Sequence, residues 1–162
     1  MFAVLVAAYV GVSVAFFVEP TLGSLAHPQV VAVLGGYGNR DPRALAVARA
    51  EHVRTVAVSW PPYSSCPSAQ RGLRIFCFVP KPVSTQGEAR ALARLERLHG
   101  WKRVLVVAGT TQIVRARLRL ERCSPARLAF VGVDPSGPFS WLYEIAYDQA
   151  ALLKALVWQR GC

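Results

Sequence analysis

The sequence has little acidic charge, few histidines and no cysteine pair spaced as CxxC. Of its 162 residues, only 9 are Asp or Glu, against 19 Lys or Arg, and only 3 are His. Because His27, His52 and His99 lie far apart, no zinc-type cluster is present and no metal site is predicted. No Ser-His-acid or Cys-His set occupies positions typical of nucleophilic catalysis. The sequence therefore leaves open whether the protein is an enzyme.

The excess of basic residues gives a formal net charge of +10, which favours anionic partners in general. Phospholipid headgroups, lipid-linked phosphates and anionic wall polymers all satisfy this condition, and charge alone does not choose between them. Nucleic acid is not predicted as a partner, because the cysteines discussed below favour a domain that faces outward.

The first 18 residues contain no charged side chain, and Glu19-Pro20 ends this apolar run. As a helix, a segment of this length reaches about 27 Å, close to the ~30 Å thickness of the hydrocarbon core of a bilayer. We therefore expect a transmembrane anchor or uncleaved signal over residues 1–18, followed by a linker over 19–28. A buried core helix and a signal peptide cleaved near Ser24-Leu25-Ala26 are the alternatives.

Four cysteines follow this segment, and an even count behind a membrane-targeting sequence favours disulfides. Four cysteines allow three pairings. Cys66 and Cys77 bracket one short loop, and Cys162 needs a distant partner, so we expect the pairs Cys66–Cys77 and Cys123–Cys162. This predicts a single-pass protein of the cell membrane with its domain on the extracytoplasmic side. Four free thiols in a cytosolic domain are the alternative.

From Gln29 onwards, short apolar runs alternate with amphipathic stretches, which is typical of an α/β domain with a mainly parallel sheet. Strands are expected over 30–34, 55–59, 74–79, 104–108 and 128–133. Helices are expected after Asp41, from Thr85, from Thr110 or Thr111, and over about 142–159. The predicted fold is a Rossmann-like, three-layer α/β domain over residues 29–162, with about five strands and no room for a second domain.

The last of these helices carries leucines and other apolar residues at helical spacing. By the usual rule for amphipathic helices, the apolar face packs on the core. We therefore expect an inward face made of Leu142, Ile145, Ala146, Leu152, Leu153 and Leu156.

Candidate ligand-binding residues follow the predicted strands, because open parallel sheets bind ligands beyond their carboxyl ends. They are Gly35, Gly36, Tyr37, Asn39 and Arg40 after the first strand, Ser59 after the second, Thr85 and Glu88 after the third, and Thr110, Thr111, Gln112 and Arg115 after the fourth. Glycines let a ligand approach the backbone, and the N–H groups at helix starts hold anions.

Each of these features also has a purely structural reading. Gly35-Gly36 can be a plain turn, Thr85 with Glu88 forms the pattern of a capping box, and Arg115, Arg119 and Arg122 can be a solvated basic face. The glycine run is not GxGxxG, and the second strand ends in Ser59 where a dinucleotide fold has an acidic residue. No cofactor is predicted.

Three segments resemble the YdcF, SanA and ElyC family, a domain of unknown function. They are Gly35-Gly36, the segment Thr85-Gln86-Gly87-Glu88-Ala89, and the segment 107–116 that ends in Arg115-Ala116. The stretch Glu88-Ala89-Arg90, the Arg122-Cys123 pair and the last helix, which ends in a cysteine, resemble the membrane-anchored actinobacterial branch of that family. The resemblance implies a Rossmann-like domain, linked in envelope members to cell-wall or barrier upkeep, with no settled reaction.

The chain also departs from that family's pattern. Gln29 replaces an Asp, Ala108-Gly109 replace a Thr-Ser pair, and Gln112 replaces a His. Since Gln112 can form hydrogen bonds but cannot titrate, the best general acid–base candidate is lost. A cytoplasmic relative is associated with S-adenosylmethionine, which an outward-facing domain does not normally meet, so this cofactor is not carried over.

The sequence thus predicts a membrane-tethered envelope protein that binds a phosphate- or carboxylate-bearing ligand. Two alternatives remain. One is a non-catalytic envelope interaction protein with a degenerate pocket, and the other is a cytosolic enzyme that binds S-adenosylmethionine or a nucleotide.

Overall fold

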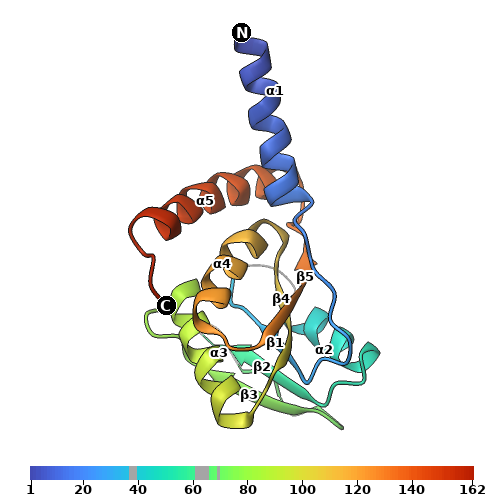
Figure 1. Ribbon diagram of the computed structural model, residues 1–162. Helices are drawn as coiled ribbons and strands as arrows, with labels where there is room; N and C mark the ends of the chain where they lie inside the picture. The colour runs from blue at the N-terminus through green and yellow to red at the C-terminus, as the bar shows by residue number, and fades with distance from the viewer. Residues whose placement is uncertain (37–39, 61–65, 69) are drawn as a thin grey trace.

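The computed structural model describes residues 1–36, 40–60, 66–68 and 70–162. In this part of the chain, five parallel strands form one sheet in the order β3-β2-β1-β4-β5 (Figure 1). The strands are β1 (Val30–Val33), β2 (Thr55–Ser59), β3 (Arg74–Phe78), β4 (Arg103–Gly109) and β5 (Arg127–Val133). The α/β Rossmann-like fold with a parallel sheet is confirmed.

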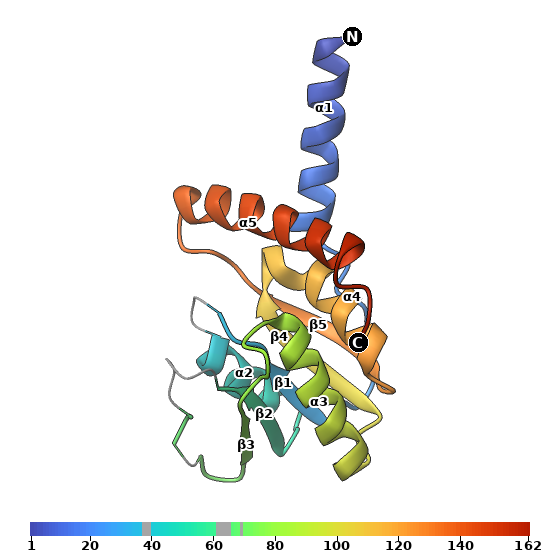
Figure 2. The ribbon, with the colours of Figure 1, turned by 90° about the vertical axis from the view of Figure 1, so that its left-hand side faces the viewer.

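Helices connect the strands and cover both faces of the sheet (Figures 1 and 2). α2 (Arg40–Ala50) follows β1, and α3 (Thr85–His99) leads from β3 to β4. A 3-10 turn (Thr110–Gln112) joins β4 to α4 (Ile113–Cys123), and α5 (Pro138–Val157) follows β5. Because β1 pairs with β2 on one side and with β4 on the other, the chain reverses its winding direction between β1 and β4.

The central strands are apolar on both faces because each face packs on helices. Val30 and Ala32 of β1 join the cluster that α3 and α4 cover. Val31 and Val33 join the cluster on the opposite face, which α2 covers together with Leu25 of the segment that precedes the sheet. All four of these β1 side chains are 0 or 1 % exposed, so β1 forms the centre of the core.

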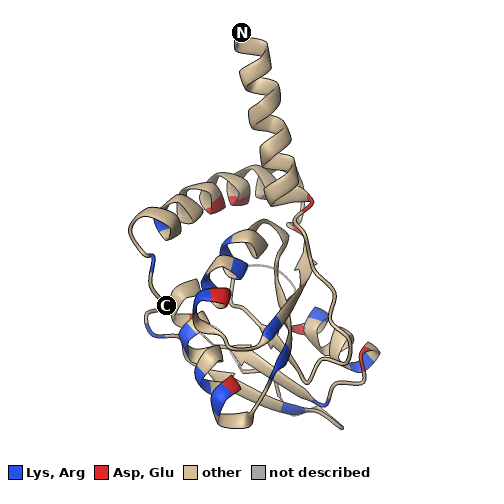
Figure 3. Cartoon of the chain, viewed as in Figure 1, with Lys and Arg blue, Asp and Glu red and all other residues tan. Residues whose placement is uncertain are grey.

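The N-terminal segment is helical and projects from the domain as α1 (Phe2–Ser13), continued by a π-helical turn (Val14–Val18) (Figures 1 and 2). No helix in the described part of the chain has both the length and the apolar character needed to cross a membrane, so the transmembrane helix expected over 1–18 is not found. Figure 3 shows that α1 carries no charged residue.

The base of α1 is fixed to α5. The Tyr9 hydroxyl donates to Gln149 Oε1 at 2.9 Å, and Gln149 Nε2 donates to Ser13 Oγ at 3.1 Å. Phe17, one turn further along, is 4 % exposed. Polar contacts and one buried ring therefore hold α1 against the domain.

Both predicted disulfides are confirmed. Cys66 is bonded to Cys77 with their Cα atoms 6.0 Å apart, and Cys123 is bonded to Cys162 with a Cα separation of 4.9 Å. The second bond ties the C-terminus to the last residue of α4. It thereby closes a 39-residue separation in sequence that contains β5 and α5.

The prediction of an inward apolar face on α5 was wrong for four of its six residues. Leu142, Leu153 and Leu156 are 68, 60 and 43 % exposed and Ala146 is exposed as well, whereas Ile145 and Leu152 are half-buried. The most buried polar residue of the helix is Asp148, at 3 %. The reason lies in α4, whose surface towards α5 carries arginines that must find hydrogen-bond acceptors when they are covered. α5 meets that surface with the side that carries Asp148 and Ala155, and it leaves Leu142, Leu153 and Leu156 exposed.

The arginines of α4 form a row along this contact, so the reading of a solvated basic face was also wrong. Arg119, which is 3 % exposed, donates to the backbone oxygen and the side-chain oxygen of Gln159. Arg122 Nη1 donates to the Ala155 and Gln159 carbonyl oxygens at 2.9 and 3.1 Å. These bonds satisfy the Ala155 carbonyl in the last turn of α5 and the Gln159 carbonyl just beyond the helix.

Candidate functional site

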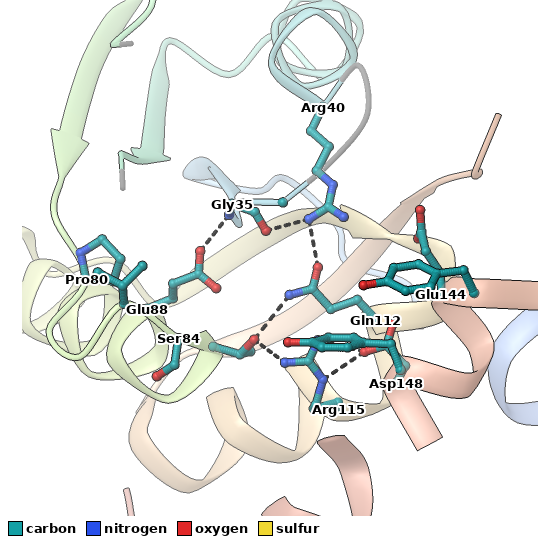
Figure 4. A pocket seen from close by; sticks show the side chains of 14 residues that line it. Gly35, Arg40, Pro80, Ser84, Glu88, Gln112, Arg115, Glu144 and Asp148 are labelled. Carbon is teal, nitrogen blue, oxygen red and sulfur yellow. Dashed lines mark hydrogen bonds and ion pairs between the residues drawn. The ribbon is translucent and has the colours of Figure 1, made fainter. Parts of the chain in front are cut away.

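A cavity of about 380 Å³ lies at the carboxyl ends of β1 and β4, where the winding direction of the sheet reverses (Figure 4). This is the position at which doubly wound sheets bind their ligands, and the volume suits a small molecule. Seven of the sequence-predicted residues line it: Gly35, Gly36, Arg40, Thr85, Glu88, Gln112 and Arg115.

Other predicted residues do not line the cavity. Thr110 donates to Asp134 Oδ1 at 2.5 Å and is covered by β5. Thr111 lies behind the cavity wall, where its hydroxyl donates to Asp148 Oδ2 at 2.8 Å. Ser59 ends β2 near Glu88 and is buried, and its hydroxyl forms no hydrogen bond of normal geometry with the described residues. Tyr37 and Asn39 lie outside the described residues.

The sequence interpretation missed the lining residues from two regions. These are Pro80, Val83 and Ser84 before α3, and Tyr143, Glu144, Tyr147 and Asp148 on α5. A signal for the second group was present, because two acidic residues four positions apart recur with two tyrosines in a mainly apolar helix. This spacing places all four on one side of the helix.

Arg40 is the centre of the site. Its guanidinium lies at the end of β1, and Nη1 donates to Gly35 O at 2.6 Å and to Gln112 Oε1 at 2.7 Å (Figure 4). The residue is 6 % exposed, and its Nε is buried without a partner in the described part of the chain. Burial lowers the pKa of Arg40, against which the carboxyl groups of Glu88, Glu144 and Asp148 act. The guanidinium nevertheless stays charged.

Two glycines make room for this guanidinium. A Cβ atom on Gly36, whose φ is 141°, would overlap Arg40 Nη1, and a Cβ on Gly109 would lie 2.6 Å from Arg40 Nη2. The positive φ of Gly36 also disfavours any other residue there. Gly109 is one of the positions at which the chain departs from the resembled pattern, and its lack of a side chain is what lets Arg40 reach Gln112.

Glu88 does not cap α3. Ser84 is the N-cap, since its Oγ accepts from the Gly87 N–H at 3.3 Å, and the capping box expected for Thr85 and Glu88 was wrong. Glu88 instead points from the first turn of α3 to the end of β1, where it accepts a hydrogen bond from the Gly35 N–H (Figure 4). Burial raises the pKa of Glu88, although that hydrogen bond and the charges of Arg40 and Arg115 act in the opposite direction.

Arg115 closes the side of the cavity next to α5. Its Nη2 lies 2.6 Å from Asp148 Oδ1, its Nε donates to the same atom at 2.8 Å, and its Nη1 donates to Thr85 Oγ1. Its guanidinium carbon lies 5.7 Å from the centre of the Tyr147 ring. Arg115 therefore links α3, α4 and α5, with most of its donors already engaged.

The charges of the cavity wall are unevenly compensated. Arg115 is paired with Asp148, and burial favours the neutral form of Glu88. Arg40 is a buried cation, and it forms no hydrogen bond or ion pair with a carboxylate of the described residues. No group of three His, Cys, Asp or Glu side chains in the described part could hold a metal ion.

The raised pKa of Glu88 predicts a pH dependence of stability. The folded protein keeps the Glu88 proton above the ordinary pKa of 4.5, at which the unfolded chain releases it. Stability from this group is therefore complete below that value and is lost as pH rises through the raised pKa. Glu88→Gln keeps an acceptor for the Gly35 N–H but cannot titrate. We expect the free energy of unfolding of this variant, measured in urea, to fall less than that of the wild type between about pH 5 and pH 8.

The matched control is Glu121→Gln, which makes the same change at an exposed position on α4. Its stability should follow the wild-type pH profile. A profile of Glu88→Gln that also coincides with the wild type would contradict the assignment.

Gly109→Ala should displace the Arg40 guanidinium from its position at the end of β1. Because the added methyl group has no free space there, we expect the free energy of unfolding in urea to fall by about 1–3 kcal/mol. Gly11→Ala is the control, since a Cβ there meets no atom within 4 Å. Equal stability of Gly109→Ala and wild type would show that Arg40 does not need this space.

The comparisons with known proteins give no neighbour for this chain. No family model matches it, and no curated protein or solved structure matches it either. The geometry of the cavity and the fold that forms it are therefore the basis for any functional assignment, and the resemblance to the YdcF, SanA and ElyC family stays a prediction.

Proposed function

We propose that this chain is a membrane-attached envelope protein whose extracytoplasmic domain binds a small phosphate- or carboxylate-bearing ligand in the cavity between β1, β4 and α5. The observation that carries the proposal is the buried guanidinium of Arg40. It lines the cavity, and no carboxylate bonds it within the described residues.

A buried cation is unfavourable unless an opposite charge or enough hydrogen-bond acceptors replace its hydration. The acceptors around Arg40 are neutral, namely two backbone oxygens and the amide oxygen of Gln112. The Nε atom has no acceptor in the described part of the chain. An anionic group in the cavity would supply the missing charge.

The helix starts around the cavity add to this preference. α2 begins at Arg40, and α3 begins beside Ser84 and Thr85, both of which line the cavity. The N-terminal end of a helix carries partial positive charge and favours anions. Glu88, in its neutral form, can donate a hydrogen bond to the same anion.

Two observations support the location. Disulfides persist in oxidising compartments, and all four cysteines are bonded, which favours the extracytoplasmic side. α1 is free of charge and exposes Phe2, Val4 and Leu5 by 81, 70 and 63 %, which favours attachment to a membrane. The resemblance to envelope members of the YdcF, SanA and ElyC family agrees with this location. We propose no reaction.

The test is calorimetric titration of the whole chain with inorganic phosphate, using acetate as the carboxylate probe. Arg40→Gln removes the cation and should weaken binding by roughly tenfold or more, because charge-assisted hydrogen bonds contribute about 1.5–3 kcal/mol. Arg40→Lys retains the charge but not the forked donors, so its affinity for phosphate should lie between those of the wild type and of Arg40→Gln.

Arg94→Gln is the matched control, since it removes one positive charge from the exposed side of α3. It should bind phosphate as the wild type does. Equal affinities of the Arg40→Gln and Arg94→Gln variants, with both folded by circular dichroism, would contradict the proposal, because binding would then follow net charge alone.

A further inference from the structure

Helix α5 turns an apolar face to the outside. Phe139, Leu142, Ala146, Leu153 and Val157 recur at intervals that place them on one side of the helix, and all five are exposed. Phe139 is 86 % exposed and Leu142 68 %. The face runs the length of a 20-residue helix, so it is a continuous patch rather than scattered single residues.

The opposite face of the same helix holds its two buried residues, Asp148 and Ala155. Asp148 pairs with Arg115. This arrangement reverses the usual one, in which the apolar side of a helix packs on the core and the polar side meets water. The contacts with α4 thus fix α5 in an orientation that leaves Leu142, Leu153 and Leu156 exposed.

We infer that the outward face of α5 lies in the interface of a lipid bilayer, beside α1, an inference that rests on the membrane attachment by α1 proposed above. This goes beyond the attachment by α1 and does not depend on which ligand the cavity takes. α1 leaves the domain at α5, where Tyr9 and Ser13 bond Gln149. The exposed apolar surfaces of the two helices therefore adjoin each other.

The arrangement of the two helices fits a plane of lipid better than a second protein. α1 projects away from the domain, and α5 runs crosswise at its base, with its outer face on the side to which α1 extends (Figures 1 and 2). A bilayer surface can contact α5 along its whole length while α1 enters the apolar interior.

The residues beside the outward face agree with an interfacial position. Trp158, just after α5, is 77 % exposed, and such side chains are enriched where membrane meets water. Lys154 is the one exposed charged residue of the helix. Its long stem can carry the ammonium group to the headgroups, where anionic lipids would attract it.

The experiment labels α5 directly, since α1 alone can hold the chain on lipid. Leu153→Cys in the full, oxidised chain is labelled with a polarity-sensitive dye and mixed with vesicles of phosphatidylcholine and phosphatidylglycerol. We expect a blue shift of the dye and quenching by nitroxides attached to the lipid chains. Leu98→Cys is the matched control, because Leu98 is 73 % exposed at the far end of α3, and its dye should change in neither respect.

Two outcomes would overturn the inference. One is a dye at position 153 that stays in water while the protein sediments with the vesicles. The other is a blue shift that develops without vesicles and grows with protein concentration, because a second copy of the chain would then cover this face.

A second pair of variants tests the energetics. Leu142→Glu with Leu153→Glu should weaken partitioning into the same vesicles by roughly tenfold or more, because two large apolar side chains are replaced by charges. Leu98→Glu should partition as the wild type does. Unchanged partitioning of the double variant, with its fold intact by circular dichroism, would also overturn the inference.

Discussion

The contact between α4 and α5 depends on arginines of α4 that α5 covers. Arg115, Arg119 and Arg122 lie along one side of α4, and each needs acceptors that water no longer supplies. Asp148 supplies a carboxylate to the first, and the carbonyl oxygens of Ala155, in the last turn of α5, and of Gln159, just after it, serve the other two. This requirement fixes which side of α5 faces the domain, and the Cys123–Cys162 bond holds the chain end in the same place.

The cavity and the exposed apolar face are two consequences of that one contact. With its polar side inward, α5 brings Tyr147 and Asp148 to the carboxyl ends of β1 and β4, where they close the cavity. With its apolar side outward, it continues the uncharged surface of α1. The opposite wall of the cavity depends on Arg40, which glycines at positions 36 and 109 admit to the end of the sheet.

Much of the fold could be predicted from sequence, because the strands are short apolar runs buried on both faces and the helices between them are amphipathic. The site position followed from the parallel sheet, as Gly35, Arg40 and Gln112 illustrate. The orientation of α5 could not be predicted in this way. The usual rule places leucines on the buried side of a helix, and here the arginines of a neighbouring helix reverse that placement. The role of Glu88 was hidden for a similar reason. Ser84 caps α3, which leaves Glu88 to bond a distant strand end.

The most direct test of this account is a double-mutant cycle between Arg115 and Asp148, measured by urea unfolding. Arg115→Met and Asp148→Leu should each destabilise by about 3 kcal/mol, since each leaves the other charge buried and unpaired. The double variant should lose clearly less than the sum of the two. Strictly additive losses would contradict the account, because the two side chains would then not hold α5 against α4 as a pair.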